Sequence, residues 1–450
     1  MLIGASIRHF ALLKAFAIGN CFLENEEQGQ QGLRRLTGII GRNNSGKSSL
    51  FEALDFAADC LRFSVPYAAN LHERGGFAQL KTKGSQGPMN LRLYYAGPGG
   101  EALLCYDLQL EADSYGRPYV AGEAVYAREV KSGETRRIFW LQEGRGEWCP
   151  EGGQEVEAIA LGDLKQPALA IYGKILRYRE LRFLYEAITG IFYLRLPKEP
   201  NHQRLKQQAG QGGHRHLNSH ADNVKNVLRY LKTEDPRAYK HMLQRLEAQI
   251  PQRGHIDDRI LDRGVESSET KLFSMLLLLE DPKPRPLILL ENPDEGLHHE
   301  MVDALGKALR RYSLRRETVQ ALVSTHSQVL LEHLGPEEVW VLRRASEATW
   351  DPQARRLPEE DAEDLDERAL LFPRQPDTRG TEAWCIASSE TVRAMYREGV
   401  GLGALWYAGY FDPDPAPDLE QGQADGAMEA ARGTAAAGSS RGVESEEEEG

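Results

Sequence analysis

The sequence has few cysteines, no long apolar run and no leader pattern. Its five cysteines are scattered, odd in number and without a CxxC pair, which favours reduced thiols over a disulfide framework or a zinc site. No apolar run reaches the roughly 18 residues that a membrane-spanning helix needs. The first residues include Arg8, His9 and Lys14 and no small-residue cleavage site. We therefore expect a cytoplasmic protein with no membrane contact.

Negative charge is concentrated in one segment. The formal net charge is −12, and residues 412–450 alone carry eleven acidic residues against two arginines, a net charge of −9. That segment is rich in Pro, Gly, Ala, Ser and Glu, so it is predicted to be a disordered acidic tail, either solubilising or a docking segment. The rest of the chain carries about −3 and has ordinary globular composition, enough for two or three domains or one large α/β unit with insertions.

Residues 36–54 (LTGIIGRNNSGKSSLFEAL) have the pattern of a phosphate loop, GxxxxGK[ST]. The apolar run 36–40 has the length and β-branching of a buried strand, and a helix is predicted from Lys47 to Phe63. Strand, loop and helix in this order are the context that a phosphate loop requires. The candidate nucleotide-binding residues are Gly41, Arg42, Asn43, Asn44, Ser45, Gly46, Lys47, Ser48 and Ser49.

The loop predicts ATP as the ligand and Mg²⁺ as its companion ion. Gly41 and Gly46 allow the backbone to wrap closely around a triphosphate, which the inward N–H groups and the helix N-terminus would bind. Lys47 would contact the β- and γ-phosphates, and the Ser48 hydroxyl would be a ligand of Mg²⁺.

The second half of the predicted site begins some two hundred residues later. After an almost wholly apolar helix at 272–279, the run 286–290 fits only a fully buried strand, and it ends at Glu291. A carboxylate at this point is the candidate second ligand of Mg²⁺. Another apolar strand, 319–323, ends shortly before His326, where a histidine could sense the γ-phosphate.

The region between these halves changes from strand to helix patterns. Two short strands are predicted within residues 2–22. Helical structure is predicted from about Leu169. Its apolar side would contain Tyr185, Ile188, Ile191 and Phe192. Alternating segments separated by Gly-rich turns, one of them at residues 144–146, predict an antiparallel meander with strands at 90–95, 102–110, 119–128, 136–142 and 155–161.

The segment 195–263 is locally basic, with fourteen Lys or Arg against eight acids, a net charge of +6. Such a surface could attract nucleic acid. The same residues also fit the exposed faces of two amphipathic helices, 224–231 and 239–250, and the lack of interleaved aromatics favours that interpretation.

A polar stretch at 201–220 lies inside this basic segment and has no periodicity. Its histidines, His214, His216 and His220, could bind a metal ion. No acid or cysteine accompanies them at ligand spacing, so a solvated loop is the favoured interpretation.

The phosphate loop, the apolar helix, the strand carboxylate, a Gly-Leu-His turn and a Ser-Thr-His-Ser segment, in this order, resemble the ABC-type ATPases of the RecF and SMC-like group. The resemblance is to prokaryotic AAA-family ATPases of repair and phage-defence operons, and it covers roughly residues 1–412. It implies an α/β fold, an ABC-type P-loop NTPase with a mixed β-sheet core, an antiparallel β subdomain and a helical insert. It also implies catalytic roles for His326 and for Gln79, which lies in the segment 75–80.

The resemblance also implies a division of the chain. The expected parts are ATPase lobe I with the phosphate loop and meander (1–200), a basic helical insert (201–264), ATPase lobe II (265–345), a C-terminal segment packing on the ATPase (346–411) and the acidic tail (412–450).

Two positions depart from the family pattern. Relatives usually carry a second acid after the strand carboxylate, which orients or deprotonates the attacking water, whereas this chain has Asn292, and an amide cannot accept the proton. The signature that caps a partner's γ-phosphate usually contains Ser-x-Gly and is Ser267-Ser268-Glu269 here. Asn292 is thus the candidate catalytic position, and Ser267 the candidate nucleotide-binding residue of the signature.

Two functions follow from these patterns. The first is an ATP hydrolase, slow or partner-activated, whose ATP-dependent dimer or higher homo-oligomer drives a partner effector, a nuclease or a DNA transaction. The second is a non-catalytic scaffold whose ATP occupancy controls assembly. Asn292 and Glu269 favour the scaffold, whereas Lys47, Ser48 and His326 favour the hydrolase, which is our working hypothesis. No nuclease motif is visible, so any DNA cleavage would need a separate protein.

Overall fold

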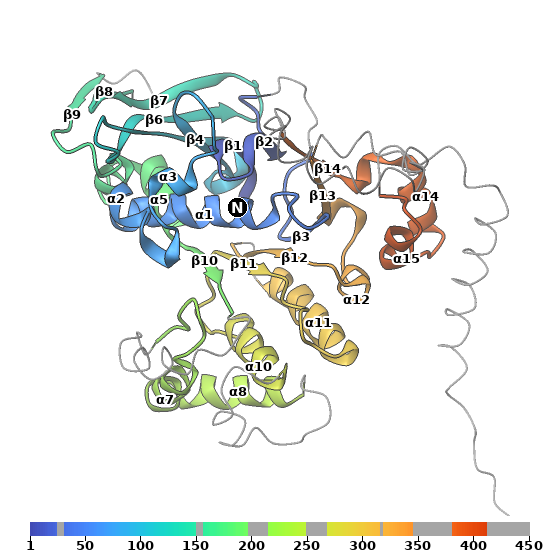
Figure 1. The fold of residues 1–450 in the computed structure, drawn as a ribbon. Helices are drawn as coiled ribbons and strands as arrows, with labels where there is room; N and C mark the ends of the chain where they lie inside the picture. The colour runs from blue at the N-terminus through green and yellow to red at the C-terminus, as the bar shows by residue number, and fades with distance from the viewer. Residues whose placement is uncertain are drawn as a thin grey trace, which may run out of the picture.

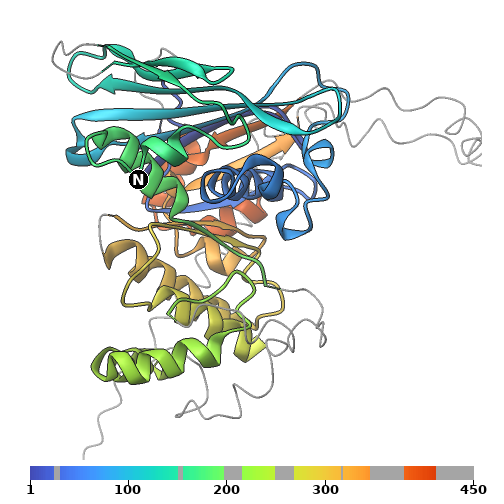
Figure 2. The same cartoon turned by 90° about the vertical axis from the view of Figure 1, so that its left-hand side faces the viewer.

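The computed structural model describes residues 1–24, 31–149, 156–196, 215–248, 268–315, 318–344 and 380–411. Two β-sheets enclose a central helix, and further helices cover the outer face of the second sheet (Figures 1 and 2). Ser267, His214, parts of the basic segment and the acidic tail lie outside the described residues.

The first sheet has eight strands in the order β2-β1-β4-β5-β6-β7-β8-β9. Every neighbouring pair is antiparallel, which confirms the predicted meander. Its strands are β1 (Leu2–Phe10), β2 (Leu13–Gly19), β4 (Met89–Ala96), β5 (Ala102–Ala112), β6 (Pro118–Glu129), β7 (Thr135–Gln142), β8 (Arg145–Trp148) and β9 (Glu157–Ala160).

The strand β8 corrects one expectation, because residues 144–146 were predicted to be a turn. The turn contains only Glu143 and Gly144, whose φ angles are both positive (48° and 76°). Two consecutive residues with positive φ reverse the chain within a two-residue hairpin. Gln142 therefore pairs directly with Arg145, and β8 begins there.

The second sheet has six strands in the order β10-β11-β12-β3-β13-β14. All neighbouring pairs are parallel except β13 with β14. Its strands are β3 (Leu36–Ile40), β10 (Ile191–Leu194), β11 (Leu287–Glu291), β12 (Gln320–Ser324), β13 (Val339–Arg344) and β14 (Thr381–Cys385).

The edge strand β10 corrects a second expectation, since Ile191 and Phe192 were assigned to the apolar side of a helix. The helix α5 (Arg179–Thr189) ends just before Gly190. A Cβ atom at Gly190 would lie 2.2 Å from Cγ of Pro286, so the glycine permits a close approach at which the chain leaves the helix and enters the sheet.

The helix α1 (Lys47–Arg62) is the centre of the molecule and lies between the two sheets (Figure 2). Leu50, Phe51, Leu54 and Phe56 are fully buried in a core that contains residues of both sheets. The helix packs against α5 and across β10 and β11. Its first turn therefore lies above the carboxyl end of β11.

Helices cover the other face of the six-stranded sheet and share a second core with it. The longer ones are α7 (Val224–Glu234), α8 (Pro236–Glu247), α10 (Ser268–Leu279), α11 (His299–Arg315), α14 (Glu390–Arg397) and α15 (Leu402–Tyr407). The short helices α2 (Val65–Ala68), α3 (Phe77–Leu80) and α4 (Leu169–Tyr172) belong instead to the first core. The other short helices are α12 (Gln328–Leu331) and the 3₁₀ helices η1 (Leu71–Glu73), η2 (Pro98–Gly100), η4 (Pro336–Glu338) and η8 (Ile386–Ser388). No described helix combines the length and apolarity required to cross a bilayer. The five cysteines are free thiols, as predicted.

Candidate nucleotide-binding site

The carboxyl ends of four neighbouring parallel strands form the candidate site. In the order β10-β11-β12-β3, the strand β3 leads into the phosphate loop, β12 leads to His326, and β11 ends at Glu291. Parallel strands end at the same edge of a sheet, which is where ligands bind in open α/β folds. The structure therefore brings these three predicted features to one edge.

The phosphate loop has the backbone conformation that its glycines allow. The φ angles of Gly41, Asn44 and Gly46 are 150°, 69° and 103°. A Cβ atom at Gly41 would lie 2.3 Å from the carbonyl oxygen of Leu342, so no larger residue fits there. The loop residues Arg42, Asn43 and Asn44 are exposed, whereas Ser45, Gly46, Lys47 and Ser49 are buried.

Lys47 folds back over the loop. Its Nζ donates hydrogen bonds to the carbonyl oxygens of Gly41 at 2.6 Å and Arg42 at 2.9 Å. Burial lowers the pKa of Lys47, and the nearby negative charge of Glu291 opposes this shift. The ammonium contacts two neutral carbonyls, so a positive charge lies at the mouth of the loop and can attract a phosphate.

Glu291 joins the two halves of the site. One carboxylate oxygen accepts a hydrogen bond from the Ser48 hydroxyl and the other accepts one from the Tyr193 hydroxyl. Ser48 and Glu291 are 243 positions apart in sequence and meet because α1 crosses β11. A hydroxyl and a carboxylate are the hard oxygen donors that Mg²⁺ prefers, so the residues present fit this ion.

Asn292 turns toward the neighbouring strand. Its amide oxygen accepts a hydrogen bond from the Ser324 hydroxyl at 3.2 Å, and its backbone N–H donates to the Ser324 carbonyl at 3.1 Å. Its φ is +41°, in the left-handed region, which Asn and Asp tolerate better than other side chains. The side chain is therefore held by β12 in a conformation suited to an asparagine.

His326 and Asp294 lie close to each other at the same edge. Asp294 accepts a hydrogen bond from the Thr325 hydroxyl at 2.8 Å. Burial and the positive charge of Lys47 lower the pKa of His326, and the negative charges of Asp294 and Glu295 oppose this. Asp294 is thus a carboxylate beside His326, two positions after Asn292.

The remaining predicted residues are less closely tied to the loop. Gln79 is exposed on α3, and no hydrogen bond within the described part of the chain joins it to Lys47, Glu291 or His326. Glu269 lies in the first turn of α10. Two residues later, Lys271 donates a hydrogen bond to the backbone carbonyl of Glu295, so this end of α10 lies beside the turn that follows β11.

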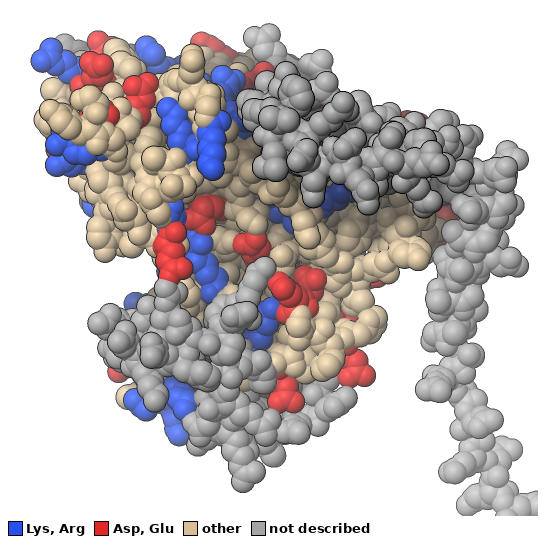
Figure 3. All heavy atoms as spheres, in the orientation of Figure 1, with Lys and Arg blue, Asp and Glu red and all other residues tan. Residues whose placement is uncertain are grey.

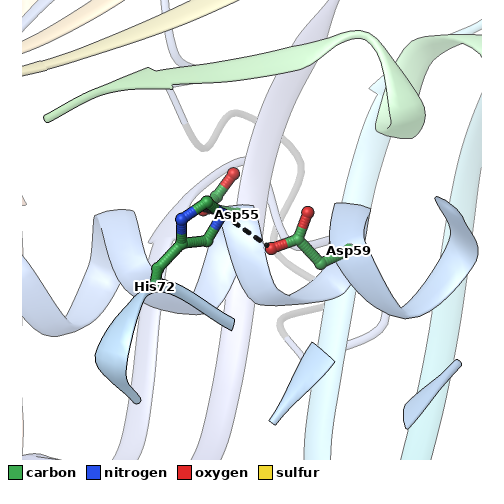
Figure 4. A group of neighbouring side chains, drawn as sticks. All are labelled: Asp55, Asp59 and His72. Atoms are coloured by element: carbon green, nitrogen blue, oxygen red, sulfur yellow. Dashed lines mark ion pairs between the residues drawn. The ribbon is translucent and has the colours of Figure 1, made fainter. Parts of the chain in front are cut away.

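A second charged cluster was not predicted. Figure 4 shows Asp55, Asp59 and His72, whose potential metal-ligating atoms all lie within 4.8 Å of one another. Arg74, however, donates to Asp55 at 2.9 Å and to Asp59 at 2.7 Å. Although burial raises the pKa of Asp59, the hydrogen bond from His72 and the charge of Arg74 lower it to about 2. Arginine therefore occupies the place that a cation would take.

Two further arginines complete this cluster. Arg62 donates to Asp59 at 2.9 Å, and Arg195 donates to Asp55 and to Glu52, each at 2.7 Å. Three acids of α1 thus face three guanidinium groups, and we assign the cluster to an ion-pair network. The available sequence signal was the helical spacing of the three acids along an otherwise apolar helix.

The basic segment is only partly a surface. Arg195 belongs to the buried network, and the apolar sides of α7 and α8 are buried, as predicted for amphipathic helices. On the face in Figure 3, basic and acidic side chains are interspersed over the described residues. His216 contacts Asp281 at 3.0 Å and His220 contacts Ser219 at 3.1 Å, and neither belongs to a metal-ligating group among the described residues.

One comparison with known proteins covers residues of this site. A family model described as "AAA domain, putative AbiEii toxin, Type IV TA system" matches residues 36–95 and 197–332. No curated protein gives a significant match.

Three solved SMC structures are distantly similar. One is an SMC head bound to the C-terminal winged-helix domain of ScpA, with 12% identity over 76% of this chain and 94% of the other, at a TM-score of 0.42. The SMC head domain from Thermotoga maritima has 13% identity over the same shares, at 0.35. The Pyrococcus furiosus SMC head with an extended coiled coil has 11% identity over 88% and 99%, at 0.43.

The family match includes the phosphate loop and the strand that ends at Glu291, which the structure places at one edge of a mixed sheet. Over these residues the chain is therefore similar to P-loop ATPases of the AAA type.

Proposed function

We propose that this protein binds ATP with Mg²⁺ and hydrolyses it slowly, and that ATP occupancy drives the pairing of two copies that act on a partner effector or a DNA transaction. The observation that carries the proposal is the hydrogen bond between Ser48 and Glu291, which unites the phosphate loop with the strand carboxylate. Ser48 and Glu291 would hold Mg²⁺, and the bound ion would neutralise phosphate charge.

The slow rate follows from Asn292. Its amide cannot accept a proton, and its oxygen already accepts a hydrogen bond from Ser324. Asp294 is the alternative that we propose, because it lies beside His326 on the same edge and one of its oxygens is free of the Thr325 bond described above. We propose that Asp294 positions the water that attacks the γ-phosphate.

The pairing of two copies is supported by the exposure of one side of the site. Arg42, Asn43, Asn44 and His326 face solvent, whereas the other side is closed by the chain itself. A phosphate bound at an exposed loop is open to water, and a second copy could cover it. Phage defence and DNA repair, the settings of the relatives that the sequence resembles, are the contexts we propose.

The test measures nucleotide affinity, molecular mass and phosphate release in wild type, Lys47→Ala and Lys307→Ala. Wild type should bind a fluorescent ATP analogue in the presence of Mg²⁺, and Lys47→Ala should bind it about 10- to 100-fold more weakly, because a charged hydrogen-bond donor to phosphate is lost. Lys307→Ala is the control, since Lys307 is an exposed lysine that pairs with Asp303.

Light scattering with ATP and Mg²⁺ should show a dimer for wild type and the control, and a monomer for Lys47→Ala. Phosphate release separates the two candidate functions. A wild-type rate equal to that of Lys47→Ala, with intact ATP binding, would favour the non-catalytic scaffold, which Asn292 also fits. Equal ATP affinity in all three proteins would refute the proposal.

A further inference from the structure

We infer that Tyr193 is a positioning residue for the metal site, a role that no sequence motif assigns to it. The inference rests on the proposed function, because it concerns the Mg²⁺ that accompanies ATP. Tyr193 lies on β10, the edge strand next to β11, and its hydroxyl donates a hydrogen bond to Glu291. It thereby fixes the carboxylate that we expect to hold the ion.

Each carboxylate oxygen of Glu291 has its own hydrogen-bond partner. One oxygen contacts Ser48, the other predicted ligand, and the second contacts Tyr193. A carboxylate held by only one of these bonds can rotate about its terminal torsion, which has a broad energy profile. With both bonds formed, the oxygen that faces Ser48 has a fixed direction. Partners of this kind orient metal ligands in many proteins and strengthen metal binding.

The ring of Tyr193 is itself held on two sides. Phe51 of α1 meets it edge to face, with ring centroids 5.9 Å apart and an interplanar angle of 84°. The guanidinium of Arg195 lies 4.1 Å from the ring centroid. Only 5% of Tyr193 is exposed to solvent. The position of the hydroxyl is therefore set by packing before any ligand arrives.

Arg195 is in turn fixed by the ion-pair network. Its guanidinium donates to Glu52 and to Asp55, each at 2.7 Å, and both acids belong to α1. The residues at positions 193 and 195 of one strand end thus contact the strand carboxylate and the helix that carries the phosphate loop. The geometry between Ser48 and Glu291 is therefore set jointly by α1, β10 and β11.

A packing role alone would not need the hydroxyl. The contacts with Phe51 and Arg195 involve the ring, and a phenylalanine would keep its shape and most of its burial. The substitution Tyr193→Phe therefore removes the hydrogen bond to Glu291 while the core remains filled. The matched control is Tyr178→Phe, because Tyr178 is also buried and its hydroxyl donates to a glutamate, Glu157, at 3.2 Å.

The experiment titrates Mg²⁺ into each protein in the presence of a fluorescent ATP analogue and repeats nucleotide binding in EDTA. We expect Tyr193→Phe to raise the Mg²⁺ concentration at half-saturation about 10-fold, in line with the loss of an outer-shell partner. Nucleotide affinity in EDTA and the melting temperature should change little, and Tyr178→Phe should match wild type in the Mg²⁺ titration.

Unchanged Mg²⁺ dependence in Tyr193→Phe would overturn the inference, and so would an equal loss of nucleotide affinity with and without Mg²⁺. In either case a wild type that binds nucleotide in a Mg²⁺-dependent manner leaves the proposed function intact. A wild type without Mg²⁺-dependent binding would instead refute both.

Discussion

Single residues set the chemistry of the site, and Asn292 shows this most directly. The positive φ at this position is adopted more readily by Asn or Asp than by a longer acid such as Glu. Aspartate has nearly the same shape as asparagine and keeps an oxygen that can accept the hydrogen bond from Ser324. It is therefore the substitution that adds a carboxylate with the least disturbance.

We expect Asn292→Asp to release phosphate faster than wild type. A positioned general base contributes on the order of 10²- to 10⁴-fold, and even an imperfectly placed carboxylate should give a measurable part of that. Steady-state phosphate release, with Lys47→Ala as the blank, checks the rate. A variant that binds ATP normally and turns over at the wild-type rate would show that position 292 does not limit hydrolysis.

Glu123 makes stability depend on pH. Its carboxylate is buried and accepts hydrogen bonds from the Tyr106 hydroxyl at 2.9 Å and from the N–H groups of Ala168 at 2.5 Å and Leu169 at 2.8 Å. Burial raises the pKa of Glu123 from 4.5 to about 7, although these hydrogen bonds oppose the shift. The folded protein thus binds the proton more tightly than the unfolded chain does, so this contribution to stability is complete below pH 4.5 and disappears as pH rises through 7.

Between pH 5 and pH 8, the free energy of unfolding of wild type should therefore fall by about 2 kcal/mol more than that of Glu123→Gln, which cannot ionise. Urea unfolding at both pH values measures the difference. The comparison uses the slope with pH, because the glutamine also changes the hydrogen bonds at every pH. Parallel pH profiles for the two proteins would contradict the assignment.

At the scale of elements, α1 is held by charge as well as by its apolar core. The side chain of Arg74 is 1% exposed and contacts all three acids of the helix. Removing one partner from a buried ion pair leaves uncompensated charge, whereas exposed pairs contribute little. The loop that carries Arg74 is therefore tied to α1 by charge.

We expect Arg74→Met to lower the free energy of unfolding by about 3 to 5 kcal/mol, since the acids would lose their shared partner in the protein interior. Arg182→Met is the control, because Arg182 pairs with Glu186 on the surface of α5 and should change stability by less than about 1 kcal/mol. Urea midpoints of both variants test this. Similar losses in the two variants would argue against a special role for the buried network.

The sequence correctly predicted the elements whose pattern lies within a single short stretch of residues. The phosphate loop, the apolar strand ending at Glu291 and the alternating strands of the meander are all encoded in short stretches. The strand β10 has only four residues directly after a helix, so its apolar residues were assigned to that helix. Tyr193 and Arg195 were not predicted because their partners lie 98 and 140 positions away, and only the packing of α1 across β10 brings them together.

At the scale of the whole molecule, buried hydrogen bonds join the two sheets. The Gln320 side chain at the start of β12 accepts a hydrogen bond from the backbone N–H of Leu2 at 3.0 Å and donates one to its carbonyl at 2.8 Å. Gln320 is almost wholly buried, so both bonds are shielded from water. The first strand of the antiparallel sheet is thus fixed to the sheet that carries the site.

The strand order also determines when the site can exist during synthesis. Ribosomes add about 5 to 20 residues per second, so the 243 positions between Ser48 and Glu291 take roughly 10 to 50 s to make. Over that interval, the antiparallel sheet can close from successive hairpins and cover one side of α1. The nascent chain would then keep its phosphate loop without a metal carboxylate until β11 has emerged and β12, which is made next, joins β11 to β3. The order of translation would thereby bury one side of α1 first and complete the nucleotide site only afterwards.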